Sequence, residues 1–246
     1  MGHLTGHLEK LNSDKKSYGI GMIKSIIFDL NGTLDNTDKA FKKALFLTLK
    51  KFLPKKRNKE IQVFADELLV FFWQADKIAD LKYPYWSMEQ IIEFGVRNWM
   101  KFRKIKINPK LFSKQYDSVR KKFLIIKPEF VKLIKSLPKN LLKFIFSQGN
   151  TKKDVLLLLN KVNLTENNFT EIITTKMFKK ETKPSLFILN YILKKYSLKP
   201  NECLMVSDDV FLDLMPAKIL GMKTILISDY VDYLIKRANT LKKLIS

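Results

Sequence analysis

The 246-residue chain has few of the side chains that enzymes use for thiol, imidazole or zinc chemistry. It has one cysteine, Cys203, which excludes an internal disulfide and fits a reducing compartment, so a cytoplasmic location is expected. Cys203 lies in an apolar stretch, which favours a buried structural role. Both histidines, His3 and His7, lie close to the N-terminus, which argues against histidine-based triads and most zinc sites. Catalysis would therefore depend on carboxylates, lysine, hydroxyl groups or a hard metal ion.

Long hydrophobic runs are also missing. No segment approaches the roughly 18 uninterrupted apolar residues that a membrane helix needs, so no membrane association is expected. Residues 1–21 are polar and contain no apolar block typical of a secretory signal. These residues are predicted to form a flexible leader.

Acidic residues are outnumbered by basic ones, 24 to 46, which gives a net charge of +22. The lysines are spread along the whole chain and form no single arm or stripe, which indicates a solvated basic surface. Such a surface would attract anionic substrates. Nucleic-acid binding stays possible on charge alone, but no motif supports it.

Strand-like apolar runs alternate with helical patterns, which predicts a parallel sheet of α/β type. The predicted strands are 23–30, 141–147, 171–174, 203–206 and 224–227, and the predicted helices between them are 152–162, 185–196 and 212–220. Residues 36–126 interrupt this alternation with four amphipathic helical patterns. The sequence therefore predicts a core domain of 22–35 and 127–246, and an inserted all-helical cap domain of 36–126.

Four polar segments follow the predicted strands or open a helix, and ligands in open α/β sheets bind at such strand ends. The segments are Asp29-Leu30-Asn31-Gly32-Thr33, Ser147-Gln148-Gly149-Asn150, Lys183-Pro184-Ser185 and Ser207-Asp208-Asp209-Val210-Phe211-Leu212-Asp213. In this order they resemble the four motifs of the haloacid dehalogenase-like (HAD) hydrolase superfamily. The resemblance covers residues 23–227 and is closest to the phosphatase branch with a helical cap after the first strand. It implies a Rossmann-like parallel-sheet core.

The resemblance also implies roles for individual residues. Asp29 would be the nucleophile that takes up the phosphoryl group as an aspartyl-phosphate. The implied catalytic residues are Asp29, Asn31, Ser147 and Lys183. The implied substrate-binding residues are Gly32, Thr33, Ser147, Gln148, Gly149 and Lys183. Specificity would come from the cap, where the candidate residues are Trp73, Tyr83, Tyr85, Trp86, Arg97 and Arg103.

A cation is expected on physical grounds, because Asp29, Asp208 and Asp213 would meet at neighbouring strand ends and could not all stay ionised without a counter-charge. Mg²⁺ suits such a site, since it binds through one or two carboxylates and keeps waters and phosphate oxygens as its other ligands. By resemblance, the metal ligands would be the Asp29 carboxylate, the Asn31 backbone carbonyl and Asp208. Asp213 would orient the surroundings of the metal or Lys183.

Two residues depart from the pattern of the family. Asn31 stands where phosphatases of this family usually carry a second aspartate, which protonates the leaving oxygen and then activates water. Loss of such a group costs about 10²–10⁴-fold in rate. Ser207 replaces a usual glycine and is expected to affect only the local backbone fit.

Three interpretations of Asn31 stay open. The protein is a slow phosphatase for leaving groups that need little protonation, a phosphate-binding relative with vestigial catalysis, or an enzyme that uses another group such as Asp35. The sequence thus predicts a Mg²⁺-dependent phosphatase acting on a small phosphorylated metabolite. The alternatives are a non-catalytic phosphate-binding or interaction protein and a haloacid dehalogenase, which lacks the second aspartate but does not need the acid pair Asp208 and Asp213.

Overall fold

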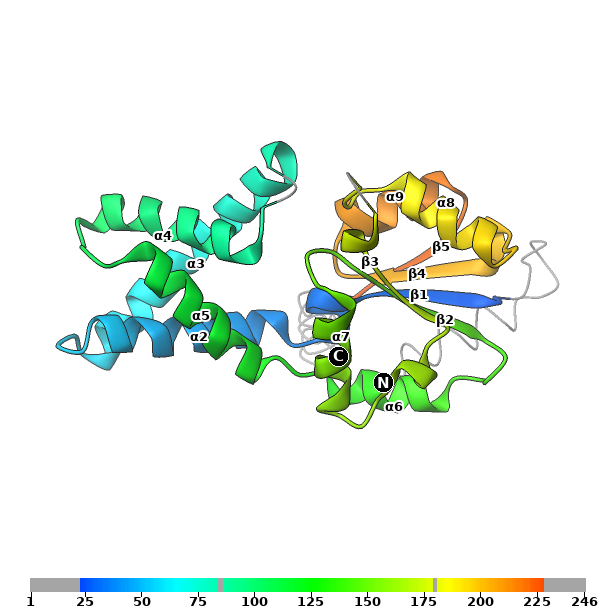
Figure 1. Cartoon of the computed structure of the whole chain (residues 1–246), viewed down its shortest axis with the longest axis horizontal. Helices are drawn as coiled ribbons and strands as arrows, with labels where there is room; N and C mark the ends of the chain where they lie inside the picture. The colour runs from blue at the N-terminus through cyan, green and yellow to red at the C-terminus, as the bar shows by residue number, and fades with distance from the viewer. Residues whose placement is uncertain (1–22, 84–85, 179–180, 228–246) are drawn as a thin grey trace, which may run out of the picture. The chain divides into compact units, whose positions relative to one another are not determined.

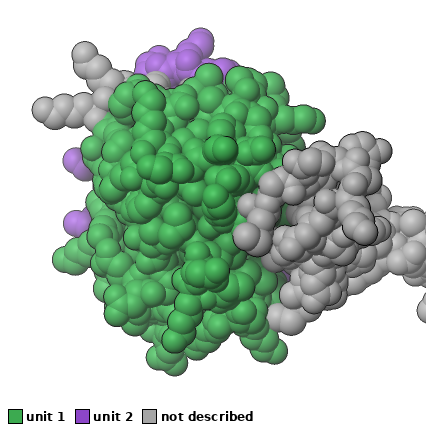
Figure 2. Space-filling model, turned by 90° about the vertical axis from the view of Figure 1, so that its right-hand side faces the viewer, with its two compact units in different colours: residues 1–35, 126–246 green, residues 36–125 purple. Residues whose placement is uncertain are grey.

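The computed structural model describes residues 23–83, 86–178 and 181–227 and divides the chain into two compact units (Figure 2). The core unit joins Met1–Asp35 to Ile126–Ser246, and the cap unit is Asn36–Ile125. Ile126, which the sequence boundary placed in the cap, belongs to the core unit, where it pairs with Asp35 in an isolated antiparallel bridge. The predicted leader lies outside the described residues.

The core unit is built on a five-stranded parallel sheet (Figure 1). Its strands are β1 (Ser25–Asp29), β2 (Leu142–Ser147), β3 (Glu171–Thr174), β4 (Cys203–Ser207) and β5 (Lys223–Leu226). Their order is β3-β2-β1-β4-β5, so the first strand lies at the centre and the chain crosses over it between β3 and β4. The Rossmann-like α/β prediction is therefore confirmed. Such a reversal of strand order marks the usual ligand position in open α/β sheets.

Helices cover both faces of this sheet, with α8 and α9 on one side and α6 and α7 on the other (Figure 1). They are α6 (Pro128–Ser136), α7 (Lys152–Asn160), α8 (Leu186–Lys195) and α9 (Met215–Ile219). Short helical turns connect these elements: Leu30–Leu34, Glu166–Asn168, Thr175–Met177, Pro200–Glu202 and Val210–Leu214.

Two of these elements differ from the sequence prediction. Helix α6 was not predicted, although Pro128 occupies its first turn and Phe130, Leu133 and Ile134 give it a buried face. The helix expected over 212–220 is shorter, because Val210–Leu214 forms a wide turn that the Asp209 side chain caps. Only Met215–Ile219 then continues as α-helix.

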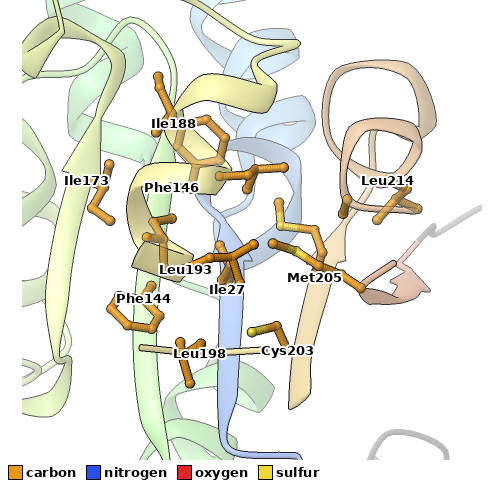
Figure 3. Close-up of a cluster of buried hydrophobic side chains, with 14 residues drawn as sticks. Ile27, Phe144, Phe146, Ile173, Ile188, Leu193, Leu198, Cys203, Met205 and Leu214 are labelled. Carbon is orange, nitrogen blue, oxygen red and sulfur yellow. The ribbon is translucent and has the colours of Figure 1, made fainter. Parts of the chain in front are cut away.

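A hydrophobic cluster locks the sheet to the helices of one face (Figure 3). It gathers Ile27 of β1, Phe144 of β2 and Met205 of β4 against Ile188 of α8, all of them fully buried. Burial of each such side chain stabilises the fold by about 1.5–3 kcal/mol. Cys203 is free and buried in the same cluster, as expected for a structural cysteine. The cluster fixes the three central strands, whose ends carry the polar residues.

The cap unit consists of four helices, α2 (Thr37–Phe52), α3 (Asn58–Lys82), α4 (Met88–Arg103) and α5 (Pro109–Phe123). Each packs against two of the others around a core of its own. Helix α4 begins after Ser87, whose hydroxyl accepts a hydrogen bond from Gln90 N, and α5 after Asn108, whose Oδ1 accepts from Leu111 N. No helix in the described part of the chain is long and apolar enough to cross a membrane.

Four of the six candidate specificity residues have partners within the cap unit. Arg97 pairs with Glu93 and Arg103 with Glu67. The Tyr83 and Trp86 rings stack with centroids 4.4 Å apart, and Trp73 is half exposed. Tyr85 lies outside the described residues.

Candidate active site

The carboxyl ends of three adjacent strands bring the predicted motifs together. β1 pairs with β2 on one side and with β4 on the other, and the register sets Asp29 beside Phe146, one residue before Ser147. Asp29 is the last residue of β1 and is 6% exposed. A carboxylate this deep at the edge of a sheet needs a specific partner, because burial alone disfavours its charge.

Lys183 is that partner. Its ammonium group, in a side chain 3% exposed overall, donates to Asp29 Oδ1 at 2.6 Å and to Asp213 Oδ2 at 3.0 Å. Burial raises the pKa of Asp29, and the nearby Lys183 charge opposes this rise. Burial lowers the pKa of Lys183, but its two carboxylates outweigh burial and leave that pKa raised overall. Lys183 is thus a fixed cation at the predicted nucleophile.

Asp213 holds Lys183 in place. Burial raises the pKa of Asp213 to about 6, against the opposing attraction of Lys183. The Ser207 hydroxyl donates to Asp213 Oδ2 at 2.8 Å and accepts from Asp209 N at 3.0 Å. The sequence suggested that Ser207 affects only the local backbone fit. The structure gives it a further role, because its hydroxyl supplies a hydrogen bond to Asp213 that a glycine could not make. Asp213 was predicted to orient either the surroundings of the metal or Lys183, and these contacts agree with the second role.

Asp208 is fixed against the turn after β1. The Thr33 hydroxyl donates to Asp208 Oδ1 at 2.8 Å and accepts from Asp208 N at 2.8 Å. Gly32 has φ = +79°, and a Cβ at this position would lie 2.2 Å from Asp208 Oδ2. Glycine is therefore required both by the backbone and by the close carboxylate. In this structure Gly32 and Thr33, predicted as substrate-binding, support Asp208.

Lys127 is a second cation at this turn, and the sequence analysis did not find it. Its ammonium group donates to the Gly32 carbonyl oxygen at 2.7 Å. Loss of hydration raises the pKa of Asp208, whereas Thr33 and then Lys127 act against this rise. Lys127 directly precedes Pro128, at the point where the chain re-enters the core unit, and this position could have indicated its role. The chain has so many lysines that the sequence did not distinguish this one.

The loop after β2 is more internally bonded than expected. Ser147 is 0% exposed, and its Oγ accepts from Asn150 Nδ2 at 2.8 Å. The same Nδ2 donates to Asn31 Oδ1 at 3.3 Å. Gln148 Oε1 accepts from Lys183 N at 2.9 Å, so Gln148, predicted as substrate-binding, positions the lysine segment.

Gly149 has φ = +78° with open space around its α-carbon, and it donates weakly from its N–H to Thr175 Oγ1 at 3.5 Å. Asn150 belongs to the predicted second motif, but the sequence predicted no role for its side chain.

The charges of the site favour a bound cation. The carboxylates of Asp29, Asp208 and Asp213 face the ammonium groups of Lys183 and Lys127, and the Asp208 charge raises the pKa of Asp29. The pKa values of all three carboxylates are raised, chiefly by burial, so added positive charge would stabilise their ionised forms. No group of three or more histidine, cysteine or acidic side chains in the described residues forms a metal cage. Two carboxylates with all-oxygen chemistry nevertheless fit Mg²⁺, which seldom uses an all-protein cage.

Fold and site together define a class of protein: a parallel-sheet α/β protein with a buried carboxylate–lysine pair at the end of its central strand. The family model for haloacid dehalogenase-like hydrolases matches residues 26–227, and the chain belongs to this family. Members of the family act as phosphatases or as dehalogenases, and magnesium is common among them. None of the curated proteins compared with the chain by sequence is a significant match.

Solved structures share the fold at low sequence identity. The HAD hydrolase YfnB from Bacillus subtilis, bound to magnesium, superposes with a TM-score of 0.69 at 14% identity and covers 84% of this chain and 89% of its own. L-2-haloacid dehalogenase from Xanthobacter autotrophicus gives 0.59 at 19% identity, with coverage of 85% and 80%. A predicted phosphoglycolate phosphatase from Haemophilus somnus gives 0.57 at 18%, with coverage of 85% and 86%. These similarities show the fold, and the substrate has to be inferred from the residues of the site.

Proposed function

We propose that the protein is a magnesium-dependent phosphatase that hydrolyses a small phosphorylated metabolite through an aspartyl-phosphate on Asp29. The observation that carries this proposal is the buried contact of 2.6 Å between Asp29 Oδ1 and Lys183 Nζ, with Asp208 held nearby. Lys183 opposes the rise that burial causes in the pKa of Asp29, and it therefore favours the ionised carboxylate, the form that can attack phosphorus.

The residues of the chain would divide the work. A carboxylate oxygen of Asp29 forms the bond to phosphorus, while the bond from phosphorus to the leaving oxygen breaks. Lys183 offsets the negative charge of the phosphoryl oxygens, and Asp213 and Ser207 keep the lysine aimed at the site. The basic surface of the chain draws the anionic substrate toward the site.

Magnesium would be held by Asp29, Asp208 and the backbone carbonyl of Asn31. When bound it supplies positive charge that stabilises the transferring phosphoryl group. Thr33 and Gly32 serve this arrangement, because they fix the Asp208 carboxylate over the nucleophile turn. Lys127 adds a fixed positive charge at the same turn.

Two alternatives are less well supported. A haloacid dehalogenase works without a metal and does not need the acid pair Asp208 and Asp213, yet both acids are present and the Asp208 charge raises the pKa of Asp29. A non-catalytic phosphate-binding protein agrees with the absence of an acid at Asn31. It gives no reason, however, for a buried carboxylate paired with lysine at the point where phosphorus would bind.

Hydrolysis of p-nitrophenyl phosphate with and without Mg²⁺ tests the proposal. Activity is expected to require the metal and to fall to the uncatalysed rate in Asp29→Ala. The matched control is Asp66→Ala, an exposed aspartate on α3, which should keep full activity. Calorimetry should show weaker Mg²⁺ binding in Asp208→Asn. Metal-independent release of phosphate, or equal activity in Asp29→Ala, would refute the proposal.

A further inference from the structure

Asn150 links the two residues that flank the predicted phosphate position. Its Nδ2 group has two hydrogens, and both are within reach of acceptors: Ser147 Oγ at 2.8 Å and Asn31 Oδ1 at 3.3 Å. Ser147 is fully buried, whereas Asn31 and Asn150 are partly exposed. A ligand can therefore meet the carboxamide of Asn31 more readily than the hydroxyl of Ser147.

This contact sets the direction of the Asn31 carboxamide. A carboxamide accepts at its oxygen and donates at its nitrogen, and the two ends point apart. Because Asn150 holds the oxygen end, the nitrogen end of Asn31 is the one left for a ligand. Asn31 then offers an N–H donor to an oxyanion, two residues after the nucleophile. Unlike a carboxyl group, the carboxamide cannot transfer a proton to the leaving oxygen or take one from water.

We propose that Asn150 is a positioning residue that holds Asn31 as a donor, and that this pair restricts the enzyme to phosphates whose leaving oxygen departs as an anion. This inference rests on the proposed phosphatase function. The substrate class is then an aryl, enol or acyl phosphate, whose leaving group is acidic, and not a simple alkyl phosphate.

The chemistry balances without a proton donor. Asp29 forms the bond to phosphorus, the bond to the leaving oxygen breaks, and the electron pair leaves on that oxygen, where the Asn31 N–H stabilises it. In the second step a water oxygen bonds to phosphorus and the electron pair of the broken bond returns to Asp29. The water proton passes to the phosphate product or to solvent. Since the Asn31 carboxamide cannot remove that proton, the second step is slow and the phosphorylated protein accumulates.

Stopped-flow kinetics with Mg²⁺ test this directly. p-Nitrophenyl phosphate should give a burst of about one nitrophenolate per protein followed by slow turnover, and an alkyl phosphate such as glycerol 3-phosphate should give no detectable burst. Asn31→Asp should raise the rate with the alkyl phosphate by about 10²–10⁴-fold, the usual worth of a general acid–base. It should abolish the burst by speeding the second step.

Asn150→Leu, which keeps the size but removes the donor, tests the positioning role. The change removes the hydrogen bonds to Ser147 and to Asn31, and loss of the one to Asn31 should by itself slow the p-nitrophenyl phosphate burst by about 2–12-fold. In an Asn31→Ala background the same change should have a smaller effect, whereas general damage to the loop would act equally in both backgrounds. The control Asn160→Leu, at the exposed end of α7, should leave the burst unchanged.

The outcomes separate the two proposals. If no phosphate is hydrolysed and no phosphorylated protein forms, the proposed function itself fails. If hydrolysis occurs with equal rates for alkyl and aryl phosphates and without a burst, the phosphatase stands and the inference is overturned. If Asn150→Leu acts equally with and without Asn31, Asn150 does not act through Asn31.

Discussion

Replacement of Lys183 by methionine should destabilise the core unit strongly at neutral pH. The ammonium group is shared by Asp29 at 2.6 Å and Asp213 at 2.9 Å, and both carboxylates are buried. Methionine keeps most of the side-chain volume but leaves two buried charges without their cation. Removal of one partner from a buried ion pair costs about 3–5 kcal/mol. With a urea slope of about 2 kcal/mol per molar, the unfolding midpoint should fall by about 1.5–2.5 M.

The assay can separate the two units of the protein. All three tryptophans, Trp73, Trp86 and Trp99, lie in the cap unit, so their fluorescence reports on its unfolding. Far-UV circular dichroism reports on both units. Lys183→Met should lower the urea midpoint of the core transition in circular dichroism, and the loss relative to wild type should shrink as pH falls and the two carboxylates take up protons.

The matched control is Lys195→Met. Lys195 pairs with Glu171 at 2.8 Å, but its side chain is exposed, and exposed pairs contribute about 0–1 kcal/mol. Its midpoint should stay close to that of wild type. A core midpoint for Lys183→Met within the error of the Lys195→Met value at pH 7 would refute the claim that Lys183 neutralises the buried acids.

Three further predictions concern the residues around this pair. Gly32→Ala forces a left-handed backbone and a clash with Asp208, so it should destabilise the core by more than about 1 kcal/mol in urea and weaken Mg²⁺ binding in calorimetry; unchanged affinity would contradict the close approach. Thr33→Val removes the hydroxyl from two hydrogen bonds with Asp208, and the free energy of unfolding of the core unit, measured in urea, should fall by about 1–3 kcal/mol; a neutral result would show that Asp208 needs no such support. Burial raises the pKa of Asp213 to about 6, above the usual 3.8, so the folded state holds an extra proton between pH 4 and pH 6 and the stability from this group is lost as pH rises through that window. Asp213→Asn should reduce that slope in urea midpoints measured between pH 4 and pH 7, and an unchanged slope would assign it to other groups.

Local chemistry in the sequence was sufficient for much of the fold. The alternation of apolar strands and helices predicted all five strands to within two residues of their ends. The signal is clearest for β1 and β4, in which every residue is buried and which read as continuous apolar runs. Gly221, two residues after the end of α9, has φ = +85°, a left-handed backbone that glycine adopts without strain. Helix α6 was missed, although Pro128 in its first turn and its three buried side chains are typical of a short amphipathic helix.

The site was predictable where one motif supplies one group. Asp29, Lys183 and Asp208 stand at the strand ends or turns expected from their positions in the sequence. The contacts between motifs were not predictable, because they depend on the register of separate strands. Asn150 touches Asn31 across 119 positions, and Lys127 touches Gly32 across 95. In the same way, the complete burial of Ser147 follows from packing that its own motif does not encode.

The most direct test of the account is the identity of the phosphorylated residue. Protein mixed with p-nitrophenyl phosphate and Mg²⁺ can be quenched and reduced with borohydride, which converts an aspartyl-phosphate to homoserine, and its peptides can then be read by mass spectrometry. The account predicts homoserine at position 29 alone, with Asp208 and Asp213 unmodified and no conversion without substrate. Phosphate release with an unmodified Asp29, or conversion at a different aspartate, would contradict it.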